Sequence, residues 1–236
     1  MSSRFSKRSY EREIMDDLDG GGEVMATTLK ELEVINRTLG GNAVSISGLN
    51  RLLKRTGTDK PLHIADIGCG GGDMLIEMAK WGRKKGLTLT LTGIDANPHI
   101  IEMARANTTA YPEIRYEVQD IFSPEYRNNR YDIVNCSLFT HHFRDEELID
   151  MFQTMHAQSS LGFIINDLHR HWFAYHSIRV LTRLFSRSPM VQNDGPLSVL
   201  RAFRKPELDR LMSCSGVTHY DLDWYWAFRW RLVAWH

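Results

Sequence analysis

The sequence predicts an α/β fold in which parallel strands alternate with helices, and three observations point to it. An apolar strand at residues 62–67 runs into a glycine-rich turn, and a helical pattern follows at 74–81. Further strand and helix patterns alternate as far as residue 167, and acidic residues end three successive strands. Because parallel strands end at one edge of a sheet, these acids should line a single ligand crevice.

The bulk composition is that of a globular protein with one main domain, because 42% of its 236 residues are hydrophobic and 25% are charged. Lys+Arg and Asp+Glu number 29 each, so no overall field favours nucleic acid or a membrane as partner. No apolar run has membrane-spanning length, so a cytoplasmic location is expected. Cys69, Cys136 and Cys214 lack metal spacing and fit free thiols.

Residues 1–60 precede the first strand and are expected to form a helical cap on a main domain at 61–236. Apolar residues recur at helical spacing over 25–39 and again over 46–53. The Asp19-Gly20-Gly21-Gly22 stretch ahead of them would be a flexible joint. The cap could close over a ligand, or these helices could simply pack on the edge of the core.

The glycine-rich turn favours close approach of the backbone to a ligand. Gly68, Gly70 and Gly72 have no Cβ, and Asp66 places a carboxylate at the end of the strand. A dinucleotide fingerprint would need glycine or alanine where the chain has Asp73. A carboxylate at a helix start repels phosphate, so the pattern argues against pyrophosphate. An ordinary strand-to-helix turn is the alternative interpretation.

The second strand, at 87–95, ends on Asp95, where βαβ units place a carboxylate that binds ribose hydroxyls. A helix cap is the other possible role of Asp95, although Asn97 fits that role better. The helix that follows is expected at 100–106.

The third strand is expected at 114–121 and leaves Asp120 at its end. A fourth strand at 131–138 opens into a loop at 139–143 that contains two histidines. Core packing alone does not explain acids at the ends of three successive strands. A polar ligand along that edge of the sheet does explain them.

From about residue 60 to 167 these motifs resemble class I S-adenosylmethionine (SAM)-dependent methyltransferases in order and spacing. The resemblance implies a Rossmann-like, seven-stranded, mostly parallel sheet with helices on both faces and an antiparallel C-terminal edge. It also implies SAM as cofactor. The implied cofactor-binding residues are Asp66, Gly68, Gly70 and Gly72 for the methionyl part, Asp95 with Ala96 for the ribose, Asp120 with Ile121 for the adenine, and Ser137 with Leu138 near the sulfonium.

The subgroup that the chain resembles methylates small molecules of quinone and polyketide pathways, which implies an aromatic or polyketide-like acceptor. A fifth strand is expected at 162–167, and an insertion at about 168–205 would build the substrate wall. The front of this insertion is aromatic, and its seven basic residues face only Asp194. A solvated basic face is one interpretation, and an anionic substrate or an acyl carrier protein is the other.

The candidate catalytic residues follow the fourth strand. His141 and His142 are placed to act as a base toward a phenolic acceptor. Adjacent loop residues point differently, so one of the two is expected to reach the acceptor, and His142 is preferred. Local hydrogen bonding of a loop histidine is the alternative. Asp167, His169 and His171 are second-rank candidates as base partner or acceptor ligands. Their spacing matches no zinc site, so no metal is expected.

The last strands are expected at Val217–Leu222 and Trp226–Val233, after a helix that begins at Pro206. The tryptophans of this region are interpreted as packing residues and not as a base-stacking platform: Trp224, Trp226, Trp230 and Trp235. The predicted function is O-methylation of a phenolic hydroxyl, with ring C-methylation as a close variant. A non-catalytic SAM-binding partner subunit is the rival class, and an oligomer is possible.

Overall fold

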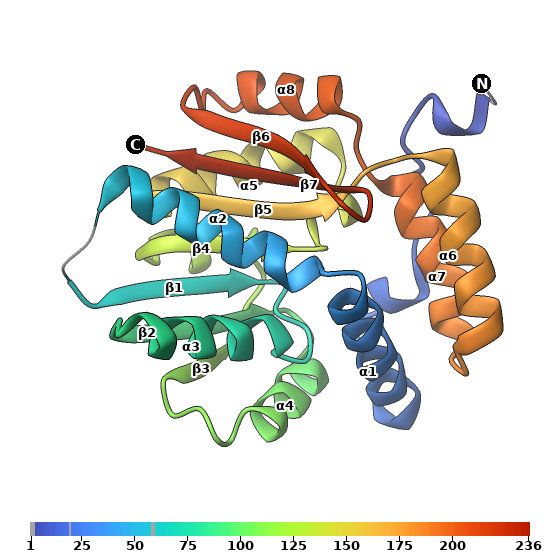
Figure 1. The fold of residues 1–236 in the computed structure, drawn as a ribbon, viewed down its shortest axis with the longest axis horizontal. Helices are drawn as coiled ribbons and strands as arrows, with labels where there is room; N and C mark the ends of the chain where they lie inside the picture. The colour runs from blue at the N-terminus through green and yellow to red at the C-terminus, as the bar shows by residue number, and fades with distance from the viewer. Residues whose placement is uncertain (1–2, 19, 58–59) are drawn as a thin grey trace.

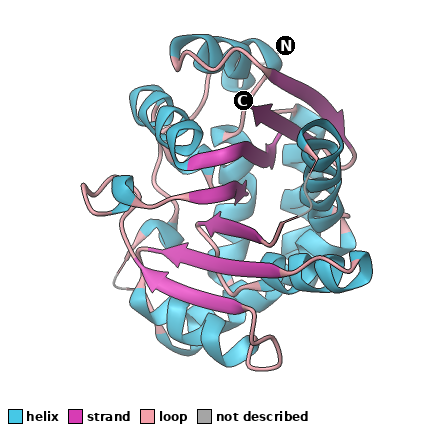
Figure 2. Cartoon of the chain, turned by 90° about the vertical axis from the view of Figure 1, so that its left-hand side faces the viewer, coloured by secondary structure: helices cyan, strands magenta, loops and turns pink. Residues whose placement is uncertain are grey.

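The fold is organised around one sheet of seven strands, in a computed structural model that describes residues 3–18, 20–57 and 60–236 (Figures 1 and 2). The strand order is β3-β2-β1-β4-β5-β7-β6. The first five strands are parallel, and β7 and β6 add an antiparallel edge. The strands are β1 (Leu62–Ile67), β2 (Leu89–Asp95), β3 (Ile114–Val118), β4 (Tyr131–Ser137), β5 (Ser159–Leu168), β6 (Tyr220–Tyr225) and β7 (Arg229–Trp235). The predicted fold class is confirmed.

Helices cover both faces of the sheet, as the two buried clusters of apolar side chains show. α2, α3 and α4 pack on one face, and α5 and α8 pack on the other. The helices are α1 (Gly22–Thr38), α2 (Gly41–Thr56), α3 (Asp73–Lys85), α4 (Pro98–Asn107), α5 (Asp145–Gln158), α6 (Trp172–Phe185), α7 (Pro189–Arg201) and α8 (Lys205–Cys214). The central strands are buried on both faces, which explains why they lack polar alternation.

The strand order reverses at β1, which has β2 on one side and β4 on the other. Parallel sheets bind ligands at such a switch point, outside the carboxyl ends of the strands. The glycine turn after β1 and the histidine loop after β4 both lie at this edge, and the acids Asp66 and Asp95 come from β1 and β2.

The N-terminal region divides into a core helix and a segment beside the crevice. α2 packs on β5 and β7, and its Gly48 lies against Ile164 with no room for a Cβ. α1 instead contacts α4 and α7, and residues 3–18 run past α7, where Phe5 packs on Tyr175. Since α2 packs on the sheet, a cap that moves can be proposed only for the residues that precede α2. Asp19 of the predicted joint lies outside the described residues.

The predicted bounds of the last two strands were wrong by about three residues. β6 spans Tyr220–Tyr225 and β7 spans Arg229–Trp235, so Trp226 lies in the turn between them and not in a strand. Phe228 closes this turn with φ +55°. Aromatic residues favour strands, and the turn contains no glycine, proline or asparagine, so the sequence pattern concealed it.

The predicted insertion forms two helices, α6 and α7, that pack on each other at one side of the molecule (Figure 1). Within the described residues, no helix combines the length and apolar character needed to cross a membrane.

Candidate active site

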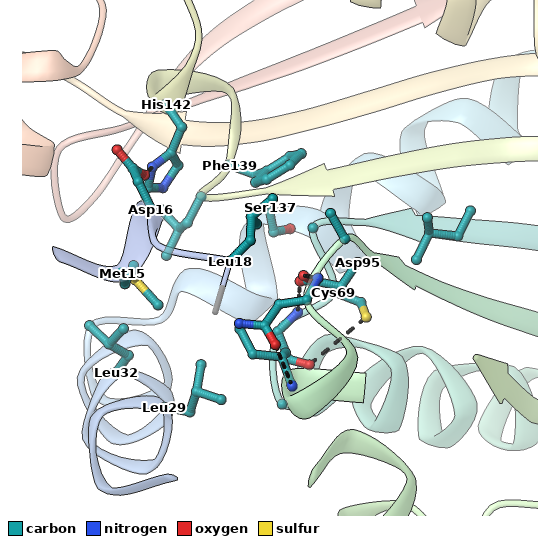
Figure 3. A pocket seen from close by; sticks show the side chains of 18 of the residues that line it. Met15, Asp16, Leu18, Leu29, Leu32, Cys69, Asp95, Ser137, Phe139 and His142 are labelled. Carbon is teal, nitrogen blue, oxygen red and sulfur yellow. Dashed lines mark hydrogen bonds and ion pairs between the residues drawn. The ribbon is translucent and has the colours of Figure 1, made fainter. Parts of the chain in front are cut away.

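A cavity of about 1500 Å³ opens at the carboxyl ends of β1, β2 and β4 (Figure 3). α1 and the N-terminal segment close it on the other side, through residues such as Met15, Leu29 and Leu32. Nine of the ten predicted cofactor-binding residues line it: Asp66, Gly68, Gly70, Asp95, Ala96, Asp120, Ile121, Ser137 and Leu138. Gly72 caps α3 and does not line the cavity. Of the predicted insertion, only Arg201 borders the cavity.

The glycine loop brings bare backbone to the cavity wall. Gly68 has φ +65°, and a Cβ there would collide with the ring of Phe139. Gly70 has φ +51°, and the atom nearest to its ideal Cβ position is Leu29 Cδ2 at 3.9 Å. Glycine is required at these positions because side chains disfavour positive φ, and Gly70 leaves open space in front of the backbone.

Asp66 is a buried carboxylate at the floor of the cavity. It is 2% exposed, and its Oδ1 accepts a hydrogen bond of 2.7 Å from Asn135 Nδ2. Burial raises the pKa of Asp66 to about 7. Asp73 lies nearby at the start of α3, and burial raises its pKa as well. A cationic group that entered this part of the cavity would stabilise both carboxylates in the charged form.

Asp95 is held by the backbone at the end of β2. Its Oδ1 accepts from the Asn97 amide at 3.0 Å, and its Oδ2 accepts from the Gly70 amide at 3.4 Å. Burial raises its pKa. The side chain of Asn97 caps α4 through the His99 amide, as the sequence predicts for the cap. The amides of Gly70 and Asn97 therefore orient the Asp95 carboxylate, which lines the cavity.

The other two predicted contact regions also lie on the cavity wall. Asp120 Oδ1 accepts from the Phe122 amide at 2.9 Å, which fixes the loop after β3. Ser137 Oγ lies 2.8 Å from Ser45 Oγ of α2. Leu138 has φ +53°, an unusual conformation for a branched residue and one that often marks functional sites.

His141 and His142 belong to a 3₁₀ turn at Thr140–His142, directly after β4. Their ring centroids are 4.3 Å apart with 33° between the ring planes, so the two side chains lie side by side and do not point apart as predicted. Only His142 lines the cavity, and His141 is buried behind it at 4% exposure.

His142 is oriented by an acid from the N-terminal segment. Its Nδ1 lies 2.5 Å from Asp16 Oδ1, and Arg201 donates to Asp16 Oδ2 at 2.7 Å. Burial would raise the pKa of Asp16, but its bonds to His142 and Arg201 outweigh burial and lower the pKa below its usual range. An ionised Asp16 accepts the proton of Nδ1, which leaves Nε2 of a neutral His142 as the proton acceptor.

His141 has an acid partner of its own. Its Nδ1 lies 2.7 Å from Asp167 Oδ1, and Thr140 donates to Asp167 Oδ2. Burial raises the pKa of Asp167, but the bonds to His141 and Thr140 outweigh burial and hold the pKa below its usual range. Asp167 does not line the cavity, so it positions the loop after β4 and does not reach a ligand.

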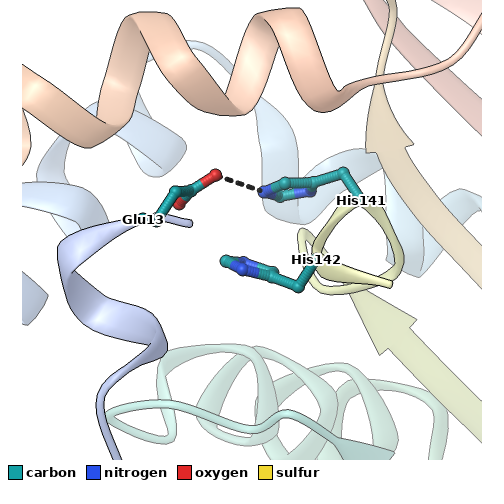
Figure 4. Close-up of side chains that lie close together, drawn as sticks. All are labelled: Glu13, His141 and His142. Atoms are coloured by element: carbon teal, nitrogen blue, oxygen red, sulfur yellow. Dashed lines mark ion pairs between the residues drawn. The ribbon is translucent and has the colours of Figure 1, made fainter. Parts of the chain in front are cut away.

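Glu13 completes a buried cluster with the two histidines (Figure 4). Glu13 Oε1 lies 3.7 Å from His141 Nε2 and 3.8 Å from Arg201 Nε. This oxygen atom has no hydrogen-bond partner among the described residues. Burial raises the pKa of Glu13 to about 7.

These three side chains are also a possible metal-ligand set, since their ligand atoms lie within 4.8 Å of one another. Ligand atoms of a tetrahedral ion lie about 3.3 Å apart at bond lengths near 2.0 Å. Glu13 Oε1 and His141 Nε2 are farther apart, at 3.7 Å. The guanidinium of Arg201 already occupies one side of Glu13 and Asp16. The arrangement suits the holding and transfer of protons better than metal ligation.

His169 and His171 lie away from the cavity. His169 Nδ1 accepts from Trp224 Nε1 at 3.1 Å. His171 caps α6 by accepting from the Phe173 amide, and its ring stacks on Phe228. The structure therefore does not bring them together with His141 and His142.

Four residues that organise the histidine loop were not predicted as site residues: Arg8, Glu13, Asp16 and Arg201. Arg201 donates to the carbonyl oxygens of both His141 and His142, and Arg8 donates to those of His141 and Phe143. These contacts join segments that are far apart in the chain, and no local spacing reveals them. In the sequence, Glu13 and Asp16 do not stand out from the other acids of their segment, Glu11, Asp17 and Asp19.

Comparison with known proteins shows which proteins this chain resembles in sequence and in fold. Residues 64–159 match the family described as a methyltransferase domain. The match covers less than half of the chain, and the fold shared with solved methyltransferase structures confirms the predicted Rossmann-like fold.

A curated relative is the ubiquinone biosynthesis O-methyltransferase of Coxiella burnetii, 31% identical over 91 residues. The match covers 38% of this chain and 36% of the relative, so the chain matches about a third of that protein's length. One similar solved structure is that of the plantazolicin methyltransferase BpumL in complex with a triazolic desmethylPZN analog and SAH. Its TM-score is 0.63 at 18% sequence identity, and the match covers 88% of this chain and 90% of that one. The citrinin polyketide synthase CMeT domain has a TM-score of 0.61 at 18% identity, over 81% and 52% of the two chains.

Proposed function

We propose that the chain is an enzyme that transfers a methyl group from SAM to a small-molecule acceptor. The observation that carries this proposal is the meeting of Asp66, Asp95 and Asp120 with the open Gly70 backbone in one cavity. The cavity volume of about 1500 Å³ exceeds the roughly 300–1,000 Å³ of ordinary ligand pockets, which suits a cofactor together with an acceptor.

The polar groups match the parts of SAM. Asp66 and the Gly70 backbone would hold the methionyl end, where an ammonium would favour the ionised form of Asp66. Asp95 would accept from the ribose hydroxyls, and Asp120 with Ile121 would flank the adenine. Ser137 and Leu138 would then lie near the sulfonium, close to the histidine loop. The curated O-methyltransferase relative and the SAH-bound structural neighbour support this assignment.

The acceptor side of the cavity is aromatic as well as basic. Phe139 and Phe143 pack edge to face with centroids 4.9 Å apart, and both line the cavity beside His142. An aromatic acceptor would pack against these rings while its hydroxyl faces His142. A phenol or a polyketide-like aromatic ring is therefore the proposed substrate class.

His142 is the proposed catalytic base. SAM supplies the methyl group and its own leaving group. His142 Nε2 would take the proton of the acceptor hydroxyl as the oxygen attacks, and the carboxylate of Asp16 would stabilise the imidazolium that forms. Ring C-methylation would use the same residue to remove a ring proton, and analysis of the product by NMR distinguishes the two outcomes.

Cofactor binding is tested by calorimetry with SAM. We expect wild type to bind SAM and Asp95→Asn to bind at least tenfold more weakly, because the ribose loses a charged hydrogen bond. Asp223→Asn is the matched control, since Asp223 is exposed and pairs with Arg231 away from the cavity. Equal affinities of wild type and Asp95→Asn would reject the ribose role.

Catalysis is tested by the release of S-adenosylhomocysteine from SAM with a panel of phenols and aromatic polyketides. Release that depends on the acceptor supports an enzyme. SAM binding with no release across the panel would favour a partner subunit that binds the cofactor without turnover. The absence of SAM binding would reject both functions.

A further inference from the structure

One face of α6 exposes large apolar side chains that no described part of the chain covers. Leu184 is 69% exposed and Phe185 is 78% exposed. The set consists of Trp172, Phe173, Val180, Leu181, Leu184 and Phe185. Residues 173, 180 and 184 follow one another at spacings of seven and four, so they share one side of the helix. Contiguous apolar surface of this kind marks an interaction site more often than chance exposure does.

The tip of the β6–β7 hairpin extends this face. Phe228 lies 5.9 Å from Phe173 and 5.7 Å from Trp226, measured between ring centroids. Trp226 is 66% exposed, and Trp224 is exposed as well. Tryptophan at the rim of an apolar surface is characteristic of side chains that sit at a membrane–water boundary. We call the α6 set and the two tryptophans the apolar face.

Basic side chains border the apolar face. Arg179 and Arg183 are exposed, lie four residues apart in a neighbouring row of α6, and have no hydrogen bond or ion pair among the described residues. No acidic residue occurs between residues 168 and 193. The shallow groove beside α6 is bordered by Arg4, Arg179 and Arg183 and by a single acid, Glu11.

We propose that the apolar face docks the protein on the surface of an anionic lipid membrane. A helix with exposed apolar side chains next to an arginine row lies in the plane of the headgroups, with its apolar side buried and its arginines on the phosphates. The zero net charge of the whole chain conceals this local charge.

Other occupants fit the face less well. A second copy of the chain would oppose the acid-free α6 with another acid-free α6, so that arginines would face arginines across a two-fold interface. An acidic carrier protein would satisfy the arginines but would leave Leu184, Phe185 and Trp226 in water. An anionic bilayer satisfies both the charge and the apolar side chains.

The apolar face is separate from the cavity, so docking can be tested without altering the proposed active site. α7 packs between α6 and the histidine loop, and the described residues of α6 do not line the cavity. The docking proposal does not rest on the proposed function.

The test is co-sedimentation of the full chain with vesicles of phosphatidylcholine alone or with an equal part of phosphatidylglycerol. We expect binding to the anionic vesicles that falls with added salt. Arg179→Gln combined with Arg183→Gln should weaken it by about 25-fold, at about fivefold for each arginine. Leu184→Ser combined with Phe185→Ser should weaken it at least tenfold. Val34→Ser is the matched control, since Val34 is an exposed apolar residue of α1.

Each variant is also examined by circular dichroism and SAM calorimetry, which report folding independently of docking. Two results would overturn the proposal. One is equal vesicle binding by wild type and both double variants, and the other is no vesicle binding by the folded wild type. If vesicle binding is absent and the Leu184→Ser, Phe185→Ser variant abolishes a concentration-dependent dimer seen in gel filtration, the face belongs to a second copy.

Discussion

Asp16 Oδ1 and His142 Nδ1 lie 2.5 Å apart, although the two residues are separated by 126 positions in the chain. This contact joins the N-terminal segment to the loop after β4, at the edge of the cavity. A carboxylate on Nδ1 fixes the tautomer of a histidine and stabilises its charged form. The N-terminal segment therefore contributes to the proposed chemistry as well as to the cavity wall.

Asp16→Asn is expected to lower kcat by about 10²-fold, within the 10²–10⁴ range of general base catalysis. The amide can donate to Nδ1 and thereby favour the tautomer in which Nε2 carries the proton. The SAM dissociation constant should stay within threefold, because Asp16 is placed at the acceptor side. Steady-state kinetics with calorimetry measures both quantities. Glu23→Gln, an exposed acid of α1, is the control, and equal losses in the two variants would contradict the role of Asp16.

Removal of metal ions is expected to leave turnover within twofold of its starting value. Glu13 Oε1 and His141 Nε2 lie 3.7 Å apart, wider than the roughly 3.3 Å between ligands of a tetrahedral ion, and Arg201 lies beside Glu13. The measurement is the rate of S-adenosylhomocysteine release before and after dialysis against a chelator. Loss of activity that zinc or manganese restores would show that the cluster is a metal centre.

Glu13 makes the stability of the protein depend on pH. Burial raises its pKa from 4.5 to about 7 in the folded state, so the native protein keeps a proton that the unfolded chain has lost. The contribution of Glu13 to stability therefore falls as the pH rises from about 4.5 to 7, by at most about 3 kcal/mol.

Glu13→Gln removes this dependence. Urea unfolding of both proteins between pH 5 and 8 should show the variant gaining stability relative to wild type as the pH rises. Parallel stability curves over that range would mean that the buried carboxyl does not titrate there.

The basic insertion contains both buried and exposed arginines, and their substitution should have different costs. Arg170 is 1% exposed and donates to both oxygens of Glu207, at 2.6 and 3.0 Å. Arg170→Met should lower the free energy of unfolding by about 3 kcal/mol, because buried acceptors lose their partner. Arg183→Met should change it by less than about 0.5 kcal/mol, because Arg183 is exposed. Similar values for the two variants in chemical denaturation would contradict the burial of Arg170.

The fold could be predicted from local patterns because the central parallel strands are apolar runs and an acid lies at or near the carboxyl ends of β1, β2 and β3. Asp66, Asp95 and Asp120 mark three strand ends, and strand ends at a sheet edge converge whatever the details of packing. The hairpin turn at Trp226 was mispredicted because its residues favour strands and contain no turn former.

Asp167, a candidate base partner in the sequence, lies beside His141, but the acid partner of His142 could not be predicted because it depends on tertiary packing. Asp16 reaches His142 only because the N-terminal segment runs past α7, where Arg201 fixes both groups. The basic insertion was treated as one surface, whereas Arg170 and Arg201 are buried among internal acceptors. Arg179, Arg183, Arg187 and Lys205 are exposed. A count of charges carries no information about which of them the fold buries.

The proposed role of His142 is to act as the base in SAM-dependent methylation of an aromatic acceptor. The most direct test is the rate of S-adenosylhomocysteine release by His142→Ala at saturating SAM, with calorimetry of SAM on the same preparation. We predict a rate at least 100-fold below wild type and a SAM dissociation constant within threefold of wild type. A rate equal to that of wild type, on an acceptor that wild type methylates, would contradict the claim.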